Sequence, residues 1–187
     1  MAESKHLVED FLNYRLLKMS RWLNHCQSRY ELMRTMDKAC QEFERRYTKK
    51  FSKLSDQIPL SANISTAELR SLFFNVNDEL FHDGIRWGRI VALFSFASSF
   101  GTSLSNYMGV IRSKAVICCL TNEYLQREIL EWVENNGGWA TFLTLFSKSG
   151  IYNENWRLKF NWLNRLAGFT VGILMISLLY KKEILQF

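Results

Sequence analysis

Apolar residues recur at intervals of three and four along most of this chain, which is the spacing of amphipathic helices. The pattern is clearest over residues 30–54, where apolar side chains form one stripe and charged side chains fill the opposite face. Similar patterns predict helices over 3–21, 66–81 and 139–146. With Pro 1 and Gly 9 among 187 residues, helix breakers are few. The sequence therefore predicts an all-α protein.

The segment "RWGRIVALFSFASSF" (86–100) is apolar on most sides, as expected of a helix in the middle of a bundle. The stretch from 110 to 136 is predicted to be a long helix. A run of small residues over 101–109 predicts a bend between them. Ser65 with Glu68 predicts a capping box, and "NGG" predicts a left-handed glycine stop after residue 136.

Composition excludes several classes of function. The hydrophobic share of 48% rules out disorder, and the net charge of +6 is only a mild bias towards anionic partners. Basic residues are scattered among acidic ones, so we expect no nucleic-acid partner. There is no CxxC pair, no histidine cluster, no nucleophile–base spacing and no phosphate loop. We therefore expect no enzyme, no catalytic residues, no metal and no cofactor, and we expect the cysteines to be reduced thiols of an intracellular protein.

The C-terminal segment 159–187 is predicted to be a membrane anchor that follows a helical domain over 1–158. Residues 166–180 carry no charge and would span roughly 22 Å as a helix, short of a hydrocarbon core of about 30 Å. Arg165 and Lys181 can extend towards the two interfaces and close that gap. A core helix, or a helix lying in a groove of its own domain, is the alternative.

Two long motifs carry a resemblance to a known family. "ELFHDGIRWGRIVALFSF" (79–96) resembles the first homology motif of the Bcl-2 family of apoptosis regulators, ELFxDGxNWGRIVAFF, and "WVENNGGWATF" resembles the second. "VEDFLNYRLLK" is similar to the fourth motif, and "MDKACQEFERRYTKKFSKL" lies where the third is carried. The resemblance implies a bundle of about eight helices, with two central apolar helices over about 85–101 and 109–131 and a hydrophobic C-terminal tail helix.

The resemblance also implies an elongated hydrophobic groove that binds an amphipathic helix of a partner protein. On periodicity alone, the apolar residues assigned to this groove are core residues, and only the resemblance assigns part of them to the groove. The implied groove residues are Phe43, Tyr47, Phe51, Leu54, Val76, Leu80, Arg86, Gly88, Arg89, Ala92, Phe96 and Phe146.

Arg89 is the most informative of these residues, because a buried unpaired charge costs several kcal/mol. The local sequence offers no obvious partner, and the resemblance implies that Arg89 pairs with an Asp of the bound helix. The alternative is an ion pair within the fold, to Glu79 or Asp83. Gly88 would allow the bound helix to come close.

The chain departs from the family pattern at two places. Arg86 replaces the usual Asn before Trp-Gly-Arg, so we expect Asp83 to cap the helix and Arg86 to favour acidic ligands. In the third motif, where the family has Leu, Gly and Asp, this chain has Met36, Cys40 and Gln41. Its own third-motif helix should therefore be a poor ligand for other grooves.

These features predict an anti-apoptotic regulator. Its expected partners are pro-apoptotic family members, both Bax- or Bak-like proteins and proteins that carry only the ligand helix. We expect it to be anchored by its tail in the mitochondrial outer membrane or the endoplasmic reticulum, facing the cytosol. The alternative is a pro-apoptotic, pore-forming executioner of the Bax and Bak type, since relatives of both kinds share the central helical hairpin.

Overall fold

The computed structural model describes residues 2–18, 27–57 and 64–147, with backbone alone for 2, 48–57 and 147. The predicted membrane anchor, 159–187, lies outside the described residues, as does its boundary with the helical domain. None of the described helices is both long enough and apolar enough to cross a membrane.

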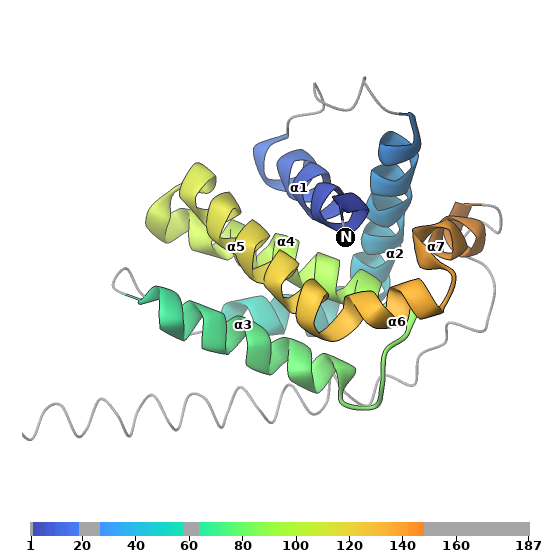
Figure 1. Ribbon diagram of the computed structural model, residues 1–187. Helices are drawn as coiled ribbons and strands as arrows, with labels where there is room; N and C mark the ends of the chain where they lie inside the picture. Colours follow the sequence, from blue (N-terminus) through green and yellow to red (C-terminus); the bar gives the residue numbers. More distant parts are fainter. Residues whose placement is uncertain (1, 19–26, 58–63, 148–187) are drawn as a thin grey trace, which may run out of the picture.

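The described part of the chain is entirely helical, as the sequence predicts, and it forms a bundle (Figure 1). In chain order its elements are α1 (Ala2–Leu17), α2 (Gln27–Gln57), α3 (Thr66–Phe81), α4 (Trp87–Met108), α5 (Val110–Tyr124), a π-helical segment η2 (Leu125–Ile129), α6 (Leu130–Asn135) and α7 (Gly138–Ser147). The backbone of α2 is kinked at Tyr47, where φ is −114° and ψ is 18°.

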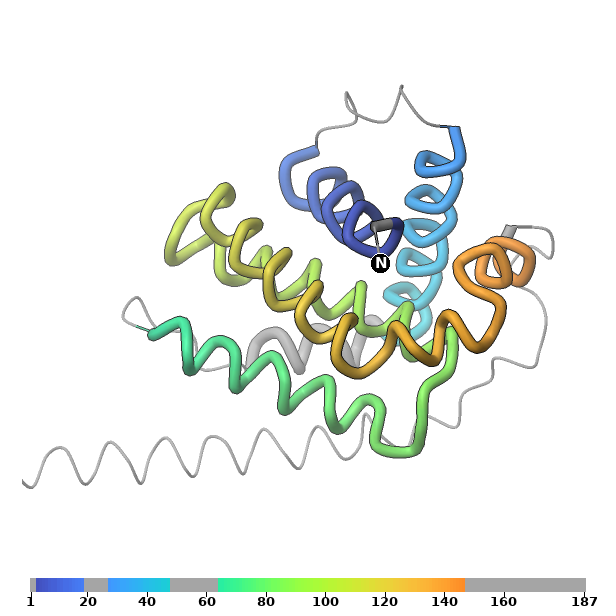
Figure 2. The backbone as a smooth tube through the Cα atoms, viewed as in Figure 1, coloured from blue at the N-terminus to red at the C-terminus, as the bar shows by residue number. Residues whose placement is uncertain are grey.

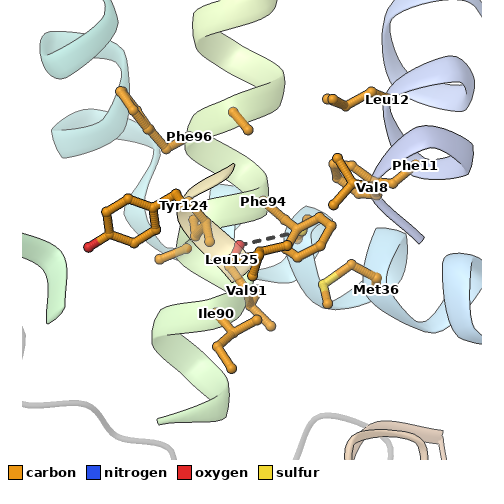
Figure 3. Packing of buried hydrophobic residues seen from close by; sticks show 14 of the residues in the cluster. Val8, Phe11, Leu12, Met36, Ile90, Val91, Phe94, Phe96, Tyr124 and Leu125 are labelled. Atoms are coloured by element: carbon orange, nitrogen blue, oxygen red, sulfur yellow. Dashed lines mark hydrogen bonds between the residues drawn. The ribbon is translucent and has the colours of Figure 1, made fainter. Parts of the chain in front are cut away.

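Helix α4 is the central element of the bundle. It lies among α1, α2, α3 and α5 and packs against all four (Figure 2). Most of its residues are buried. Figure 3 shows Phe94 of α4 meeting Phe11 of α1, with Met36 of α2 beside them. The Phe11 and Phe94 rings meet edge to face with centroids 5.2 Å apart. The prediction of a central apolar helix is thus confirmed.

Most predicted helix boundaries are confirmed. The Ser65 side chain accepts a hydrogen bond from the Glu68 backbone, and the Glu68 carboxylate accepts one from the Ser65 backbone, so the capping box at α3 is present. Gly137 and Gly138 have φ of 84° and 66°, which gives the predicted left-handed stop before α7.

The predicted bend over 101–109 is wrong. Helix α4 continues to Met108, and the chain reverses at a single residue, Gly109, with φ of 79°. Gly101 is buried inside the helix, and a Cβ built on it would lie 2.9 Å from Leu16 Cδ1. The small residue therefore serves close packing of α4 against α1, which the sequence pattern could not distinguish from a bend.

Candidate functional site

The turn between α3 and α4 places Arg89. Helix α3 ends at Phe81, and Gly84, with φ of 98°, donates its backbone N–H to the Phe81 carbonyl at 2.8 Å. The chain then runs extended through Arg86 and enters α4 at Trp87. Arg89 consequently lies in the first turn of α4, and its side chain faces back towards the turn that precedes it.

Arg89 is 5% exposed and has partners within the fold. Its Nη1 donates to the Gly84 carbonyl at 2.5 Å, and its Nη2 donates to Asp83 Oδ2 at 3.2 Å. The expectation that nearby sequence offers no partner is therefore wrong: of the two internal candidates, Asp83 forms the pair. The Asp83 side chain is 51% exposed, and Arg89 Nε has no hydrogen-bond partner among the described residues. The cation is buried, but its counter-charge is open to solvent.

Arg86 is the N-cap residue of α4, with extended φ and ψ and no side-chain capping bond. Asp83 was expected to act as the cap, but it is not the N-cap residue, and its two carboxylate oxygens contact Arg89 and His82. Helix α4 thus begins with an exposed arginine where a capping side chain would be stabilising.

The apolar residues predicted for the groove are brought together, but in the core of the bundle. Five of them are 7% exposed or less: Phe43, Val76, Leu80, Ala92 and Phe96. Tyr47 and Phe146 are half-buried against the same core. Gly88 is buried, whereas Phe51 and Leu54 lie outside the residues whose side chains are described. In this conformation a ligand helix would reach these side chains only after their neighbours move.

The third-motif helix is held to α1 by a second arginine, Arg15, whose side chain is largely covered. Arg15 Nε lies 2.7 Å from Asp37 Oδ1, and Arg15 Nη1 donates to Glu44 Oε2 at 3.1 Å. The Asp37 side chain is 1% exposed, and it also accepts a bond from Gln41 at 2.7 Å. Burial lowers the pKa of Arg15, but the acidic groups of Cys40, Glu44 and Asp37 more than offset this, so its pKa is raised.

Cys40 lies beside this ion pair and is fully buried. Its Sγ donates to the Val91 carbonyl at 3.5 Å, and burial raises the pKa of the thiol to about 12. The thiol is therefore protonated and unreactive at neutral pH. The position that holds Gly in the family pattern is here filled by a side chain packed against α4.

Sequence reasoning missed the Arg15–Asp37 pair. Periodicity could not reveal it, since the two residues are on different helices. One signal was present: Asp37 lies within the buried stripe between Met36 and Cys40, where a carboxylate requires a partner.

Trp87, Trp132 and Trp139 form one aromatic cluster. Trp87 lies 5.2 Å from Trp132 and 5.9 Å from Trp139 between ring centroids. Trp139 Nε1 donates to Ser4 Oγ at 2.9 Å, which ties α7 to α1. The cluster fixes the first turn of α4, and hence Arg89, against α6 and α7. The three described cysteines are free thiols, and the described residues hold no group that could bind a metal.

Comparison with known proteins supports one family throughout. A family model described as "Apoptosis regulator proteins, Bcl-2 family" matches residues 36–139. Apoptosis regulator R1 of Xenopus laevis is 30% identical over 178 residues, which cover 94% of this chain and 75% of that protein. Bcl-2-like protein 1 of Homo sapiens is 34% identical over 146 residues, 76% of this chain and 59% of that protein. Apoptosis regulator Bcl-2 of Cricetulus griseus is 35% identical over 125 residues, 65% of this chain and 50% of that protein.

The matched residues include the α3–α4 turn with Arg89, the third-motif helix and the start of α7. The match spans only 59% and 50% of the human and hamster relatives, and most of the Xenopus one. Both the motifs and the all-helical bundle agree with this assignment. The chain belongs to the Bcl-2 family of apoptosis regulators.

Proposed function

We propose that this chain is an anti-apoptotic regulator that binds the third-motif helix of pro-apoptotic family members, and that Arg89 pairs with the acid of that helix. The observation that carries the proposal is the Arg89 site. Its guanidinium is buried, its Nε has no partner among the described residues, and the only carboxylate paired with it there is half exposed. An incoming carboxylate could replace Asp83 without opening a buried ion pair.

The energetics favour such an exchange. A hydrogen bond to a charged group contributes about 1.5–3 kcal/mol, and a guanidinium can bind a carboxylate through two parallel bonds. The present pair uses one bond of 3.2 Å to Asp83 and one to a backbone carbonyl. A ligand acid in bidentate contact would give Arg89 a better partner and would fix the register of the bound helix.

Apolar anchors must provide most of the affinity. We propose that they contact the residues of α2, α3 and α4 that are buried in the unliganded bundle, including Phe43, Val76 and Phe96. Binding then requires α3 and the second half of α2 to move apart, an induced fit that admits the ligand helix. The kink at Tyr47 separates the two halves of α2 and supplies a point at which that movement can occur.

The proposal that the chain is anti-apoptotic and not pro-apoptotic rests on its third motif. Gln41 stands where an exposed ligand helix would present its acid, and its amide is bonded to Asp37. Cys40 fills the position of the small residue. Without the acid and the small residue, this helix is a poor ligand for another groove, so the chain acts as receptor. We further propose that residues 159–187 anchor it in an intracellular membrane, the mitochondrial outer membrane first.

Calorimetry with a panel of synthetic third-motif helices tests the receptor role. We expect tight binding to at least one helix and a loss of at least tenfold, about 1.4 kcal/mol, for Arg89→Ala. Lys38→Gln, which removes a charge from an exposed position on α2, is the control and should leave affinity unchanged. Equal affinities for wild type and Arg89→Ala would refute the role of Arg89.

Dye release from liposomes tests whether the chain is anti-apoptotic or pore-forming. An anti-apoptotic receptor should release no dye when an activating helix is added. Robust release would instead identify a pore-forming member and overturn the proposal.

A further inference from the structure

Helix α3 carries two distinct rows of side chains. On one side Phe73 faces α4, and its ring centroid lies 5.6 Å from that of Phe96, a residue assigned to the groove. The side chains of the second row are four residues apart and contact α5 instead: Arg70, Phe74 and Asp78. Because the second row includes none of the residues assigned to the groove, its contacts can be altered without removing a proposed ligand contact.

The first contact of this row is an ion pair between α3 and α5. Arg70 Nε lies 3.0 and 3.1 Å from the two carboxylate oxygens of Glu123, and Arg70 Nη2 donates to one of them. Arg70 Cζ also lies 4.2 Å from the centroid of the Phe74 ring, and Arg127 of η2 lies over the same ring at 5.5 Å. The side chains of Arg70 and Glu123 are 42% and 35% exposed, so salt in the solvent screens this pair.

The second contact is made by a buried phenol. The Tyr124 hydroxyl donates to Asp78 Oδ1 at 3.0 Å, and the Tyr124 ring meets Phe74 edge to face with centroids 5.1 Å apart. Burial, and then the Asp78 carboxylate, raise the pKa of Tyr124, so the phenol keeps its proton and remains the donor. We call these residues of α3 and α5 the α3 latch: Arg70, Phe74, Asp78, Glu123 and Tyr124.

A buried amide of α3 opposes the latch. Asn77 is fully buried, and its Nδ2 donates to the Phe73 carbonyl at 2.7 Å, but its Oδ1 has no hydrogen-bond partner within the described part of the chain. Burial of an acceptor without a partner costs free energy, and this cost disappears when the group reaches water. The position of α3 therefore depends on a balance between the Asn77 amide, which favours opening, and the α3 latch, which favours closure.

Helix α3 lies along the lower edge of the bundle in Figures 1 and 2, and it shares less contact with its neighbours than α1 or α2 does. We propose that the α3 latch sets how often α3 moves away from α4, and thereby limits access of the ligand helix to the buried groove residues. This role rests on the proposed function, in which α3 must move to admit a ligand helix. A ligand that binds only the open conformation has an apparent affinity reduced by the fraction of protein that is open. Weakening the latch therefore tightens ligand binding, although it removes contacts from the folded chain.

Hydrogen exchange of the full chain without ligand tests the latch by itself. Glu123→Gln removes the ion pair and Tyr124→Phe removes the phenol bond, and each keeps the size of the side chain. We expect the backbone amides of α3 to exchange about threefold faster in each variant, with those of α1 unchanged. High salt should speed the exchange of α3 in the wild type but not in Glu123→Gln, because screening acts on the ion pair. Glu131→Gln makes the same charge change at an exposed position of α6 and should exchange as the wild type does.

Calorimetry of the same proteins with a third-motif helix tests the effect on binding. Glu123→Gln and Tyr124→Phe should each bind the helix about threefold more tightly than the wild type, and the double variant about tenfold, whereas Glu131→Gln should bind as the wild type does. Wild-type exchange in both latch variants, equally fast exchange in α1, or faster exchange of α3 without tighter binding would overturn the proposal. A wild type that binds no helix would overturn the proposed function and the role of the latch in it, whereas the exchange rates would still report whether the latch holds α3.

Discussion

Two largely covered arginines of this bundle, Arg15 (side chain 15% exposed) and Arg89 (side chain 6% exposed), differ in what neutralises them. Arg15 joins two helices through Asp37, whose side chain is 1% exposed, and through Glu44. Arg89 is paired within its own turn, to Asp83, whose side chain is 51% exposed. The first arrangement can be broken only by separating α1 from α2, whereas the second can change partners without breaking an ion pair between helices. The two sites therefore differ chiefly in the accessibility of the counter-charge, and the role proposed for Arg89 depends on that difference.

The largest expected effect separates the two sites by stability. Asp37→Ala should lower the free energy of unfolding by about 3–5 kcal/mol, because it removes the 1%-exposed carboxylate from the largely covered Arg15 and leaves Glu44 as its one remaining carboxylate among the described residues. Asp83→Ala should cost less than Asp37→Ala, since the carboxylate it removes is half exposed and Arg89 keeps its bond to the Gly84 carbonyl. Urea denaturation of both variants measures the difference. Equal losses would show that the contrast between the two arginines is unfounded.

The next effect is a pH dependence in the Arg15 region. Burial raises the pKa of Cys40 from 9.0 to about 12, so the unfolded chain loses this proton before the folded chain does. The contribution of the buried thiol is complete below pH 9 and is lost as the pH rises to about 12, by about 1.4 kcal/mol per pH unit. Cys40→Ala should lack this slope in unfolding measured across that range. Parallel curves for the two proteins would contradict the assignment.

A smaller effect is expected at the start of α4. Arg86 is the N-cap and makes no side-chain capping bond. Arg86→Asn should therefore raise the free energy of unfolding by about 1 kcal/mol. Ser65→Ala, which removes an existing capping bond of α3, is the matched control and should lower it by a similar amount. A destabilised Arg86→Asn variant would mean that Arg86 has a role in the fold that its exposure conceals.

The smallest effect bears on the exchange of partners at Arg89. Asp83→Asn weakens the internal competitor but keeps an oxygen that can accept from the guanidinium. A third-motif helix should then bind several-fold more tightly than it binds the wild type, within the range of an exposed ion pair of about 1 kcal/mol. Weaker binding would show that Asp83 positions Arg89 for the ligand and does not compete with it.

Local signals in the sequence predicted much of the fold. The capping box at Ser65 and the glycine stop after residue 136 depend on neighbouring residues alone, and both are present. The prediction of a bend over 101–109 is wrong because Gly101 lies inside α4, where the lack of a side chain makes room for Leu16 of another helix. The π-helical turn of η2 also interrupts the predicted long helix, and no residue pattern announced it.

At the candidate site too, local sequence signals were informative and contacts between distant residues were not predicted. Motif resemblance singled out Arg89, and the structure places it buried at the start of α4. Its partner Asp83 is six residues away, brought back by the positive φ of Gly84, which a helical spacing rule does not consider. The Arg15–Asp37 pair depends on how α1 crosses α2, so only the folded chain reveals it.

The most direct test of the account is a double-mutant cycle across the proposed interface. Calorimetry would compare wild type and Arg89→Ala, each with a third-motif helix that carries its Asp or has Ala in that place. Exchange of Asp83 for the ligand acid predicts a coupling energy of at least about 1.4 kcal/mol, with Arg89→Ala insensitive to the ligand acid. Additive losses, with no coupling between Arg89 and that Asp, would contradict it.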